Sequence, residues 1–377
     1  MQQFSLLIKP SGSDCNLDCS YCFYKCRAPE IGQGQQRMSH EVLEKMVKDY
    51  LGLRFAQSSF SWQGGEPMLM GIQFYEDAVE LQKKYAQSGQ VVSNALQTNA
   101  VLMDECWCEF LRENKFLVGI SIDGPKELHD CYRVDHSGGG SFDKVMAAIE
   151  LCKEHKVEFN ILVLLNDKNV VCPDELFDFF VIENGIKYLQ FIPCVETDPA
   201  TGKIADFSVK PEQYGQFMCR MFDRWYKYGP TKVSIRDFDS ILFYCVSGRH
   251  TICTFDKQCS QYIVIEHSGD AFCCDFFVEP KWRLGNIMTE PIEQLANSSK
   301  KKEFARAKQQ ICNKCLICRH LELCRGGCLK NREAIAGSIV DKQSYLCEGY
   351  IQFFDYTLAR FRQLAASVVT NTANDSL

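Results

Sequence analysis

Cysteines at fixed spacings constrain the fold of this chain more than any other feature: 22 of its 377 residues are cysteine. An ordered series near the C-terminal end comprises Cys253, Cys259, Cys274, Cys315, Cys318, Cys324, Cys328 and Cys347. Nine residues separate Cys259 from Gly269, and four residues separate Gly269 from Cys274. Eight thiolates are enough to ligate two four-iron clusters with four cysteines each.

A second group of cysteines lies near the N-terminus, in the pattern Cys15-x3-Cys19-x2-Cys22. It supplies only three thiolates on one short loop, so one iron of a four-iron cluster would have no protein ligand. An iron with an open position can bind the amino and carboxylate groups of S-adenosylmethionine. The two cysteine groups together therefore indicate iron-sulfur chemistry with an exchangeable site.

Clustered cysteines also occur in zinc sites and disulfide frameworks. Two Cys-x2-Cys pairs can form a structural zinc site, and spacing alone does not separate zinc from iron in the C-terminal series. Disulfides are disfavoured, because 22 cysteines in 377 residues are more dilute than in a small stapled scaffold. A loop with three thiolates is a poor closed zinc site, which favours iron for the N-terminal group.

Short apolar runs alternate with amphipathic segments along most of the chain. The expected strands cover residues 4–9, 59–63, 94–98, 117–122, 158–165 and 188–192. The expected helices between them cover residues 41–51, 74–85, 105–113, 142–155 and 174–184. This order predicts an α/β fold with a parallel sheet and right-handed crossovers, and six units fit an incomplete (β/α)6, TIM-like barrel.

A change of pattern after Ile235 predicts a second domain made of short strands, turns and cysteines. A helix over 211–228 closes the barrel, and a final amphipathic helix covers 353–364. The predicted domains are 1–235 for the partial barrel, 236–350 for the cysteine-rich domain, and 351–377 for the terminal helix and tail. Barrel chemistry occurs at the C-terminal ends of strands, where the Cys15 loop, Gly64-Gly65-Glu66, Asn99 and Asp123-Gly124 all fall.

The bulk charge and hydropathy exclude some partners. A net charge of -6 argues against binding to nucleic acid. The N-terminal residues show no basic segment followed by a long apolar stretch, and no apolar run reaches membrane-spanning length. Many free thiols and oxygen-sensitive clusters then predict a reducing, cytoplasmic location.

Motifs along nearly the whole chain, to about residue 360, resemble those of the anaerobic sulfatase-maturating enzymes. These belong to the radical S-adenosylmethionine (SAM) superfamily and carry an auxiliary-cluster extension called SPASM. The resembling stretches are Lys9-Pro10, Cys22-Phe23-Tyr24, Gln63-Gly64-Gly65-Glu66-Pro67, Leu96-Gln97-Thr98-Asn99, Gly119 to Pro125, Gln190-Phe191-Ile192, Cys274-Asp275-Phe276 and Trp282 to Asn286. Ala100 departs from the glycine usual after this Thr-Asn pair, which affects only that turn.

The resemblance implies three 4Fe-4S clusters and assigns their ligands. Cys15, Cys19 and Cys22 would hold the SAM-binding cluster. Cys253, Cys259, Cys274 and Cys328 would hold the first auxiliary cluster, and Cys315, Cys318, Cys324 and Cys347 the second. Tyr21, Gly65, Ser121, Arg133 and Val195 match cofactor-contacting positions, and Tyr24 and Gln63 match positions that face the substrate. Without the family match, Arg133 would be a surface ion-pair partner and Gly64-Gly65 an ordinary turn.

Asp275 directly follows the expected ligand Cys274, so its carboxylate should lie in a poorly solvated place near an auxiliary cluster. From the sequence alone a carboxylate that caps a turn is an equal alternative. The family pattern favours a general base that removes the proton of a substrate thiol or hydroxyl.

The implied activity is the oxidation of a cysteine or serine in a sulfatase peptide to Cα-formylglycine. The implied partners are an unfolded or nascent sulfatase with a Cys/Ser-x-Pro-x-Arg motif and an electron carrier such as flavodoxin or ferredoxin. One rival is another SPASM peptide maturase that forms thioether crosslinks or epimerises residues. The other is a non-enzymatic iron-sulfur or zinc protein.

Two further cysteines leave open which member of each pair is the cluster ligand. We call this choice the ligand register. Cys273 adjoins Cys274, and Cys312 forms a Cys-x2-Cys with Cys315. We choose Cys274 because it keeps the four-residue spacing from Gly269, and Cys315 because it pairs with Cys318 at the right distance from Cys324.

Overall fold

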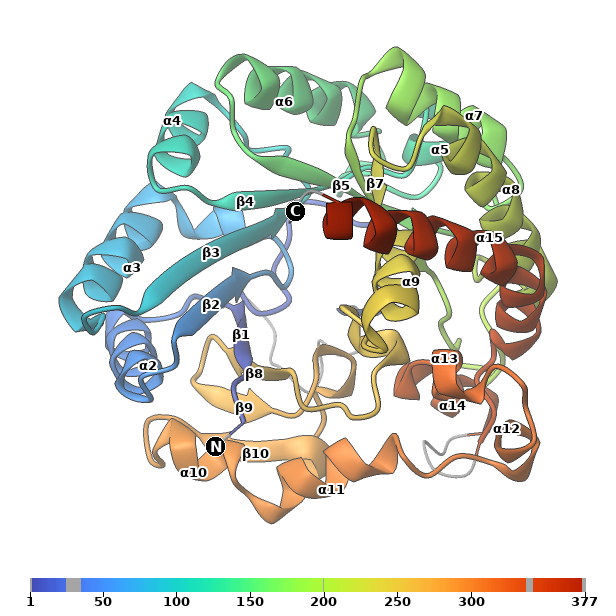
Figure 1. Ribbon diagram of the computed structural model, residues 1–377. Helices are drawn as coiled ribbons and strands as arrows, with labels where there is room; N and C mark the ends of the chain where they lie inside the picture. The colour runs from blue at the N-terminus through green and yellow to red at the C-terminus, as the bar shows by residue number, and fades with distance from the viewer. Residues whose placement is uncertain (1, 25–34, 199, 337–341, 375–377) are drawn as a thin grey trace. The chain divides into compact units, whose positions relative to one another are not determined.

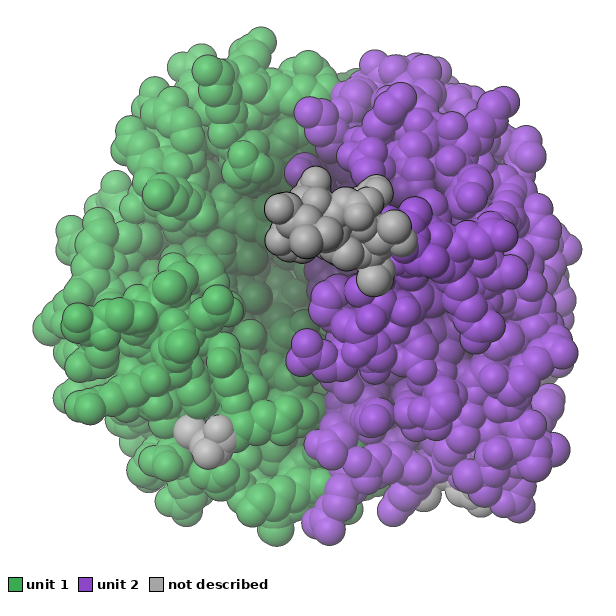
Figure 2. Space-filling view, viewed as in Figure 1, with its two compact units in different colours: residues 1–122, 129–160, 259–305 green, residues 123–128, 161–258, 306–377 purple. Residues whose placement is uncertain are grey.

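The computed structural model describes residues 2–24, 35–198, 200–336 and 342–374. They form two compact units (Figure 2). Unit 1 contains residues 1–122, 129–160 and 259–305, and unit 2 contains residues 123–128, 161–258 and 306–377. The predicted domain boundaries at 235 and 350 stay a prediction. Cys26 lies outside the described residues.

Unit 1 is built on a sheet with the strand order β10-β9-β8-β1-β2-β3-β4. Its strands are β1 (Ser5–Lys9), β2 (Gln57–Trp62), β3 (Val91–Thr98), β4 (Leu117–Ser121), β8 (Tyr262–Glu266), β9 (Asp270–Phe272) and β10 (Arg283–Asn286). The pairs from β8 through β1 to β4 are parallel, whereas β9 and β10 are antiparallel additions. Alternate residues of β2, including Phe60 and Trp62, are buried, as the two-residue period of a strand requires.

Helices cover this sheet (Figure 1), and the sequence pattern predicts all of those named below except the last two. They are α2 (His40–Gly52), α3 (Ile72–Tyr85), α4 (Glu105–Glu113), α6 (Phe142–Glu154), α10 (Ile292–Ala296) and α11 (Ser299–Ala307). Ser39 caps α2 by accepting from Val42 N, and Asp104 caps α4 by accepting from Trp107 N. Each helix buries one apolar stripe, so local sequence and packing specify the same elements.

The chain after residue 258 does not form a separate sheet. β8 pairs in parallel with β1, with Lys9 opposite Glu266. The antiparallel strand β9 then returns toward Cys273, Cys274 and the short helix η4 (Asp275–Phe277). Sequence periodicity did not indicate this pairing, yet it brings a C-terminal segment beside the first strand of unit 1.

Unit 2 contains most of β5 (Phe159–Leu165), followed in parallel by β6 (Tyr188–Pro193) and β7 (Ser234–Ile235). Its main helices are α7 (Pro173–Phe177), the π-helical turn η2 (Asp178–Glu183), α8 (Pro211–Tyr228), α9 (Arg236–Ser247) and α15 (Cys347–Asn374). Short helices surround its cysteines: η3 (Cys253–Phe255), α12 (Asn313–Leu316), α13 (Leu321–Cys324) and α14 (Leu329–Ala336). The helix α5 (Lys126–Asp130) has residues in both units.

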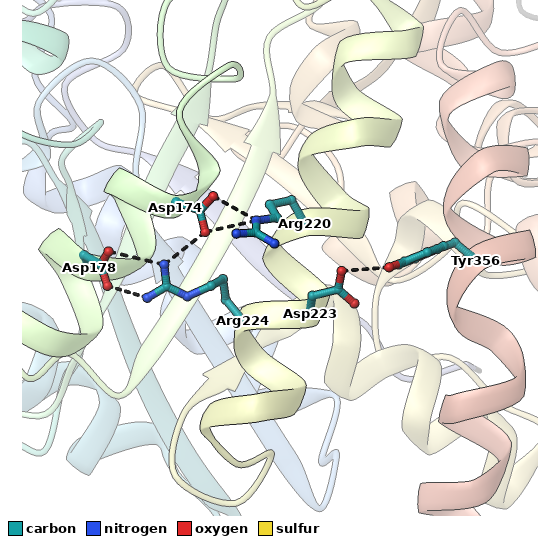
Figure 3. A network of polar contacts seen from close by, with 6 residues as sticks. All are labelled: Asp174, Asp178, Arg220, Asp223, Arg224 and Tyr356. Atoms are coloured by element: carbon teal, nitrogen blue, oxygen red, sulfur yellow. Dashed lines mark hydrogen bonds and ion pairs between the residues drawn. The ribbon is translucent and has the colours of Figure 1, made fainter.

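Charged side chains join α8 to its neighbours within unit 2 (Figure 3). Arg220 and Arg224 of α8 both bind Asp174 of α7, with N to O distances of 2.8 and 3.0 Å. On the other side, the hydroxyl of Tyr356 in α15 donates to Asp223 at 2.8 Å. Half-exposed pairs of this kind contribute little stability each.

An aromatic core stabilises the same helices more strongly. Phe222 and Trp225 of α8 pack against Phe238 of α9 and Phe361 of α15, with ring centroids 4.8 to 6.0 Å apart. The helix α15 is longer than the predicted helix over 353–364. Its first turns bury Tyr350 as well, against Tyr214 of α8.

The predicted α/β fold class is confirmed, and the six expected strands and their helices are present within a few residues of the expected bounds. The helix over 174–184 appears as α7 followed by η2. Among the described residues, no helix combines the length and apolar character needed to cross a bilayer.

Candidate active site

The cysteine loop follows β1 and is held on two sides by unit 1. On one side, Asp18 N donates to Val134 O at 2.7 Å and Ser20 N donates to Tyr132 O at 3.3 Å. Cys22 N donates to Cys19 O at 3.2 Å, which turns the loop back on itself. Asn99, directly after β3, donates from Nδ2 to Cys15 Sγ at 3.7 Å. The end of β1, the residue after β3 and the segment 132–134 thus fix the loop that carries the three thiols.

On its other side, the loop lies directly against the Gly64-Gly65-Glu66 turn. Gly65 N donates to Gly12 O at 2.9 Å, and Glu66 N donates to Asp14 O at 2.8 Å. A Cβ atom on Gly65 would lie 2.0 Å from Asp14 O, where no side chain fits. Gly64 has a φ of +127°, which an L-residue rarely adopts. The two glycines therefore let the backbone of this turn approach the cysteine loop.

We expect Gly65→Ala to push the cysteine loop away from β2 and to lower both stability and iron content. Overpacking of this kind typically costs about 1–3 kcal/mol or more. Thermal unfolding and iron analysis after anaerobic reconstitution measure both effects. Gly52→Ala is the matched control, because a Cβ there meets nothing within 4 Å. Equal iron content and stability in the two variants would contradict the assigned role of Gly65.

Glu66 is a fully buried carboxylate beneath the loop. Its Oε1 accepts from Met68 N at 2.9 Å and Thr98 Oγ1 at 2.7 Å, and its Oε2 accepts from Asn99 N at 2.8 Å. Burial raises the pKa of Glu66 to about 7, although the three donors oppose that rise. Burial first, and then Glu66, raise the pKa of Cys15 to about 12. Iron binding must therefore displace a proton from this thiol.

Four of the five expected cofactor contacts lie in unit 1. The guanidinium of Arg133 lies 5.6 Å from the ring centroid of Tyr21, within cation–π range. Ser121 is buried at the C-terminal end of β4, and Gly65 follows β2. The fifth, Val195, is buried after β6 in unit 2. The cofactor roles of these residues stay predictions.

Asp275, the expected base, lies in a cluster of charged and aromatic side chains in unit 1. Its Oδ1 accepts from the hydroxyl of Tyr24 at 3.0 Å and lies 2.7 Å from Nζ of Lys9. Lys9 Nζ also lies 3.4 Å from Glu266 Oε1 and 4.4 Å from the centroid of the Tyr24 ring. Asp275 is thus tied to two protein side chains, Tyr24 and Lys9, rather than only capping a turn.

Among the side chains around Asp275, Tyr24 acts only as a neutral hydroxyl that donates a hydrogen bond. Burial, and next the charge of Asp275, raise the pKa of Tyr24 well above its ordinary value. A phenol that keeps its proton donates a hydrogen bond and is not a base at neutral pH. Gln63, the other expected substrate contact, follows β2, and its N–H donates to Ile8 O at 2.8 Å.

The expected ligands of the first auxiliary cluster are divided between the units. In unit 1, burial lowers the pKa of Lys301, and the neighbouring thiols of Cys273, Cys274 and Cys259 oppose that shift. In unit 2, burial raises the pKa of Cys253, and the nearby Cys328 adds to the rise.

A buried lysine lies beside each half of this ligand set. Lys301 donates from Nζ to Cys273 O at 3.0 Å, and Lys308 donates to Cys253 O at 2.6 Å and Thr254 O at 2.7 Å. Sequence reasoning missed both lysines, because nothing in the local pattern marks them as buried.

The expected ligands of the second auxiliary cluster line one cavity in unit 2, of about 290 Å³. These are Cys315, Cys318, Cys324 and Cys347. The cavity walls are otherwise mostly apolar and include Tyr350 and Phe354. Four thiols around one space of this size fit a cluster of several iron atoms.

The buried Arg332 organises the loop between Cys324 and Cys328. Its guanidinium donates to four carbonyl oxygens, at 2.9 to 3.1 Å, of Gly326, Gln310, Lys308 and Arg325. A bulky charged residue in α14 gave no sequence signal for this role. Arg332 fixes backbone that would otherwise be left with unsatisfied carbonyls.

The two ambiguous cysteines differ in their surroundings. Cys273 is buried with 2% exposure, and burial raises its pKa to about 11, whereas Cys274 is partly exposed. Cys312 Sγ lies 3.6 Å from Cys315 Sγ but does not line the 290 Å³ cavity. Both observations favour the chosen register, which stays a prediction.

We expect Cys273→Ala and Cys312→Ala to keep all clusters and most activity. Cys274→Ala and Cys315→Ala should each disturb one auxiliary cluster, because each removes one of four thiolate ligands. Iron analysis and electron paramagnetic resonance of the reduced proteins distinguish the two pairs. The reverse pattern would show that the register is wrong.

No three His, Cys, Asp or Glu side chains in the described part of the chain lie close enough together to hold a single metal ion. A four-iron cluster separates its thiolates more widely than a zinc ion, which has Zn–S bonds of about 2.3 Å. The thiol-lined cavity in unit 2 is therefore compatible with a cluster.

Comparison with known families defines the class of protein. Residues 10–180 match the family model for the radical SAM superfamily, and residues 253–319 match that for an iron-sulfur cluster-binding domain, SPASM. The chain is thus a radical SAM enzyme with an auxiliary-cluster domain.

Similar proteins of known function identify the family within the radical SAM superfamily. The cysteine-type anaerobic sulfatase-maturating enzyme of Clostridium perfringens (strain 13) is 39% identical, over 98% of this chain and 100% of the relative. The serine-type anaerobic sulfatase-maturating enzyme of Bacteroides thetaiotaomicron is also 39% identical, over 93% of this chain and 88% of the relative. The chain belongs to the anaerobic sulfatase-maturating enzymes.

Solved structures agree with this family. Native anSMEcpe with bound AdoMet (S-adenosylmethionine) and Cp18Cys peptide matches with a TM-score of 0.90 and 38% identity, over 97% of this chain and 100% of that chain. SuiB of Streptococcus suis, bound to S-adenosylmethionine, has a TM-score of 0.65 at 17% identity, over 92% of this chain and 77% of that chain. The second match shows a common fold only.

Proposed function

We propose that this protein oxidises a cysteine or serine of a sulfatase polypeptide to Cα-formylglycine under anaerobic conditions, in the cytoplasm. The observation that carries the proposal is similarity over nearly the whole chain to sulfatase-maturating enzymes of both types, at equal identity. The peptide would carry a Cys/Ser-x-Pro-x-Arg motif, and flavodoxin or ferredoxin would exchange electrons with the enzyme.

The residues present fit the cofactors that this activity needs. Cys15, Cys19 and Cys22 share one rigid loop and would hold the cluster that binds S-adenosylmethionine. The eight later cysteines would hold two auxiliary clusters, and four of them line one cavity in unit 2. When bound, the cofactor supplies a 5'-deoxyadenosyl radical that removes a β-hydrogen atom from the substrate residue.

The chain's own residues then supply positioning and acid–base chemistry. Tyr21 and Arg133 would contact the cofactor, while Gln63 and Tyr24 would face the peptide. Asp275 would accept the proton of the substrate thiol or hydroxyl. The remaining electron would leave through the auxiliary cluster that Cys253, Cys259, Cys274 and Cys328 would hold. Loss of a hydrogen atom, a proton and an electron amounts to a two-electron oxidation, which yields the aldehyde directly or through a thioaldehyde that hydrolyses.

Mass analysis of a sulfatase-motif peptide after incubation with the reconstituted protein, S-adenosylmethionine and a reductant tests this proposal. The cysteine and serine versions are compared in parallel. The proposal predicts conversion of at least one residue to formylglycine. A thioether crosslink or an epimerised residue instead would favour the other class of SPASM maturase.

Anaerobic reconstitution should yield about twelve iron and twelve sulfide per chain, from three four-iron clusters. Iron and sulfide analysis, with zinc measured in the same sample, checks this number. A fully active preparation with zinc in the C-terminal series would overturn the ligand assignment.

A further inference from the structure

A buried lysine connects two acidic side chains next to the proposed base. The side chain of Lys9 is 0% exposed, and its Nζ lies 2.7 Å from Asp275 Oδ1 and 3.4 Å from Glu266 Oε1. Neither contact has hydrogen-bond alignment, so both are ion pairs. A lysine is almost never fully buried unless it is paired.

The sheet, rather than a flexible loop, fixes this arrangement. Lys9 ends β1 and stands opposite Glu266, which ends the parallel strand β8. β9 returns antiparallel to β8 and continues to Asp275 in η4. The chain therefore brings together a lysine and a carboxylate from the ends of two paired strands and a second carboxylate from the short helix η4 that follows β9.

The two oxygens of Asp275 have different surroundings. Oδ1 receives both protein contacts, from Tyr24 at 3.0 Å and from Lys9 at 2.7 Å. Within the described ranges, no hydrogen bond or ion pair reaches Oδ2. The Asp275 side chain keeps 16% exposure, whereas Lys9 has none and Glu266 has 3%.

We propose that Lys9, anchored by Glu266, is the positioning residue for Asp275, and that Asp275 Oδ2 is the oxygen that accepts the substrate proton. This inference rests on the proposed function, in which Asp275 is the base. Lys9 and Tyr24 hold Oδ1 toward the protein, which turns Oδ2 toward the remaining open side. Lys9 touches no substrate and acts only through Asp275.

The proton transfer balances without a further reactant. The S–H or O–H bond of the substrate breaks, its electron pair stays on the sulfur or oxygen, and a new O–H bond forms at Oδ2. The step adds one proton to Asp275 and leaves Glu266 unchanged beside Lys9. Glu266 thus leaves Lys9 with a partner once Asp275 is neutral, so no unpaired charge remains buried.

Lys9→Met tests the positioning role, because methionine fills most of the lysine volume and removes the charge. We expect three clusters and near-normal production of 5'-deoxyadenosine. Misplacement of a reacting group by about 1 Å can cost on the order of a hundredfold, so formylglycine formed per 5'-deoxyadenosine should fall about tenfold to a hundredfold. The loss should appear in kcat, with little change in peptide KM.

Two further variants separate positioning from general structural damage. Lys9→Met/Asp275→Asn should be no worse than Asp275→Asn alone, because residues that act as a unit are not additive. Glu266→Gln should uncouple product formation as well, since it leaves Lys9 unanchored. Lys84→Met, which removes an exposed ion pair with Glu44, is the control and should behave as the parent protein.

A normal ratio of formylglycine to 5'-deoxyadenosine in Lys9→Met, together with a severe loss of formylglycine in Asp275→Asn, would overturn this inference and leave the proposed function intact. Additive losses in the double variant, or loss of iron in both Lys9→Met and Glu266→Gln, would also overturn it. Formylglycine at the parent yield in Asp275→Asn would instead remove the base assignment itself.

Discussion

Asp275→Asn is expected to retain three clusters and to cleave S-adenosylmethionine, yet to make little formylglycine. Asparagine is nearly isosteric and can still accept a hydrogen bond from Tyr24, but it cannot take a proton from the substrate. Removal of a general base typically costs on the order of a hundredfold to ten-thousandfold in rate. The expected phenotype is therefore uncoupled production of 5'-deoxyadenosine.

Single-turnover reactions with a Cys-x-Pro-x-Arg peptide, followed by mass spectrometry, measure this loss. A substrate deuterated at the β-carbon shows in the same experiment whether hydrogen abstraction still occurs, through deuterium in 5'-deoxyadenosine. Asp77→Asn is a suitable control, because Asp77 lies on α3 and makes an exposed contact with Gln73. A near-normal formylglycine yield from Asp275→Asn would reduce this residue to a structural turn cap.

Replacement of Cys15, Cys19 and Cys22 by alanine should abolish cleavage of S-adenosylmethionine altogether. The loop supplies three thiolates, so the variant should retain about eight of about twelve iron atoms. The later cysteines follow β7 in the chain and belong to segments with their own packing, so their clusters should survive.

Iron analysis and chromatographic detection of 5'-deoxyadenosine under reducing conditions check both parts of this prediction. Alanine at Cys106 and Cys131 provides a matched control, because both thiols are exposed and neither is an expected ligand. The assignment of the loop would be wrong if the triple variant still produced 5'-deoxyadenosine, or if the control lost the same amount of iron.

Local sequence determined the elements that carry the site. Short apolar runs predicted the six strands and amphipathic patterns predicted the helices, because both are local properties of the sequence. The three-cysteine loop, the glycine turn and Asn99 were predicted at strand ends for the same reason. The structure adds why glycine is needed at residue 65: Asp14 O occupies the space of a Cβ atom.

The sequence did not predict contacts between segments that are distant in the chain. Glu66 looked like part of a turn, but three donors, two from the end of β3 and one from the 3-10 turn that directly follows Glu66, converge on its buried carboxylate. Nothing in the sequence marked Arg332, Lys301 and Lys308 as buried, yet each donates hydrogen bonds to backbone carbonyls beside a cysteine segment. Burial depends on which element covers a residue, and no local pattern records that.

The sequence by itself determined the fold class, the spacing of the cysteines and the choice of Asp275, because each is expressed within a few neighbouring residues or in a family motif. Only the tertiary structure decided what surrounds Asp275. Lys9 and Glu266 are separated by more than 250 residues in the chain, and the parallel pairing of β1 with β8 sets them opposite each other. Strand pairing across such a distance depends on global packing, and a buried lysine is favourable only where that packing supplies its carboxylates.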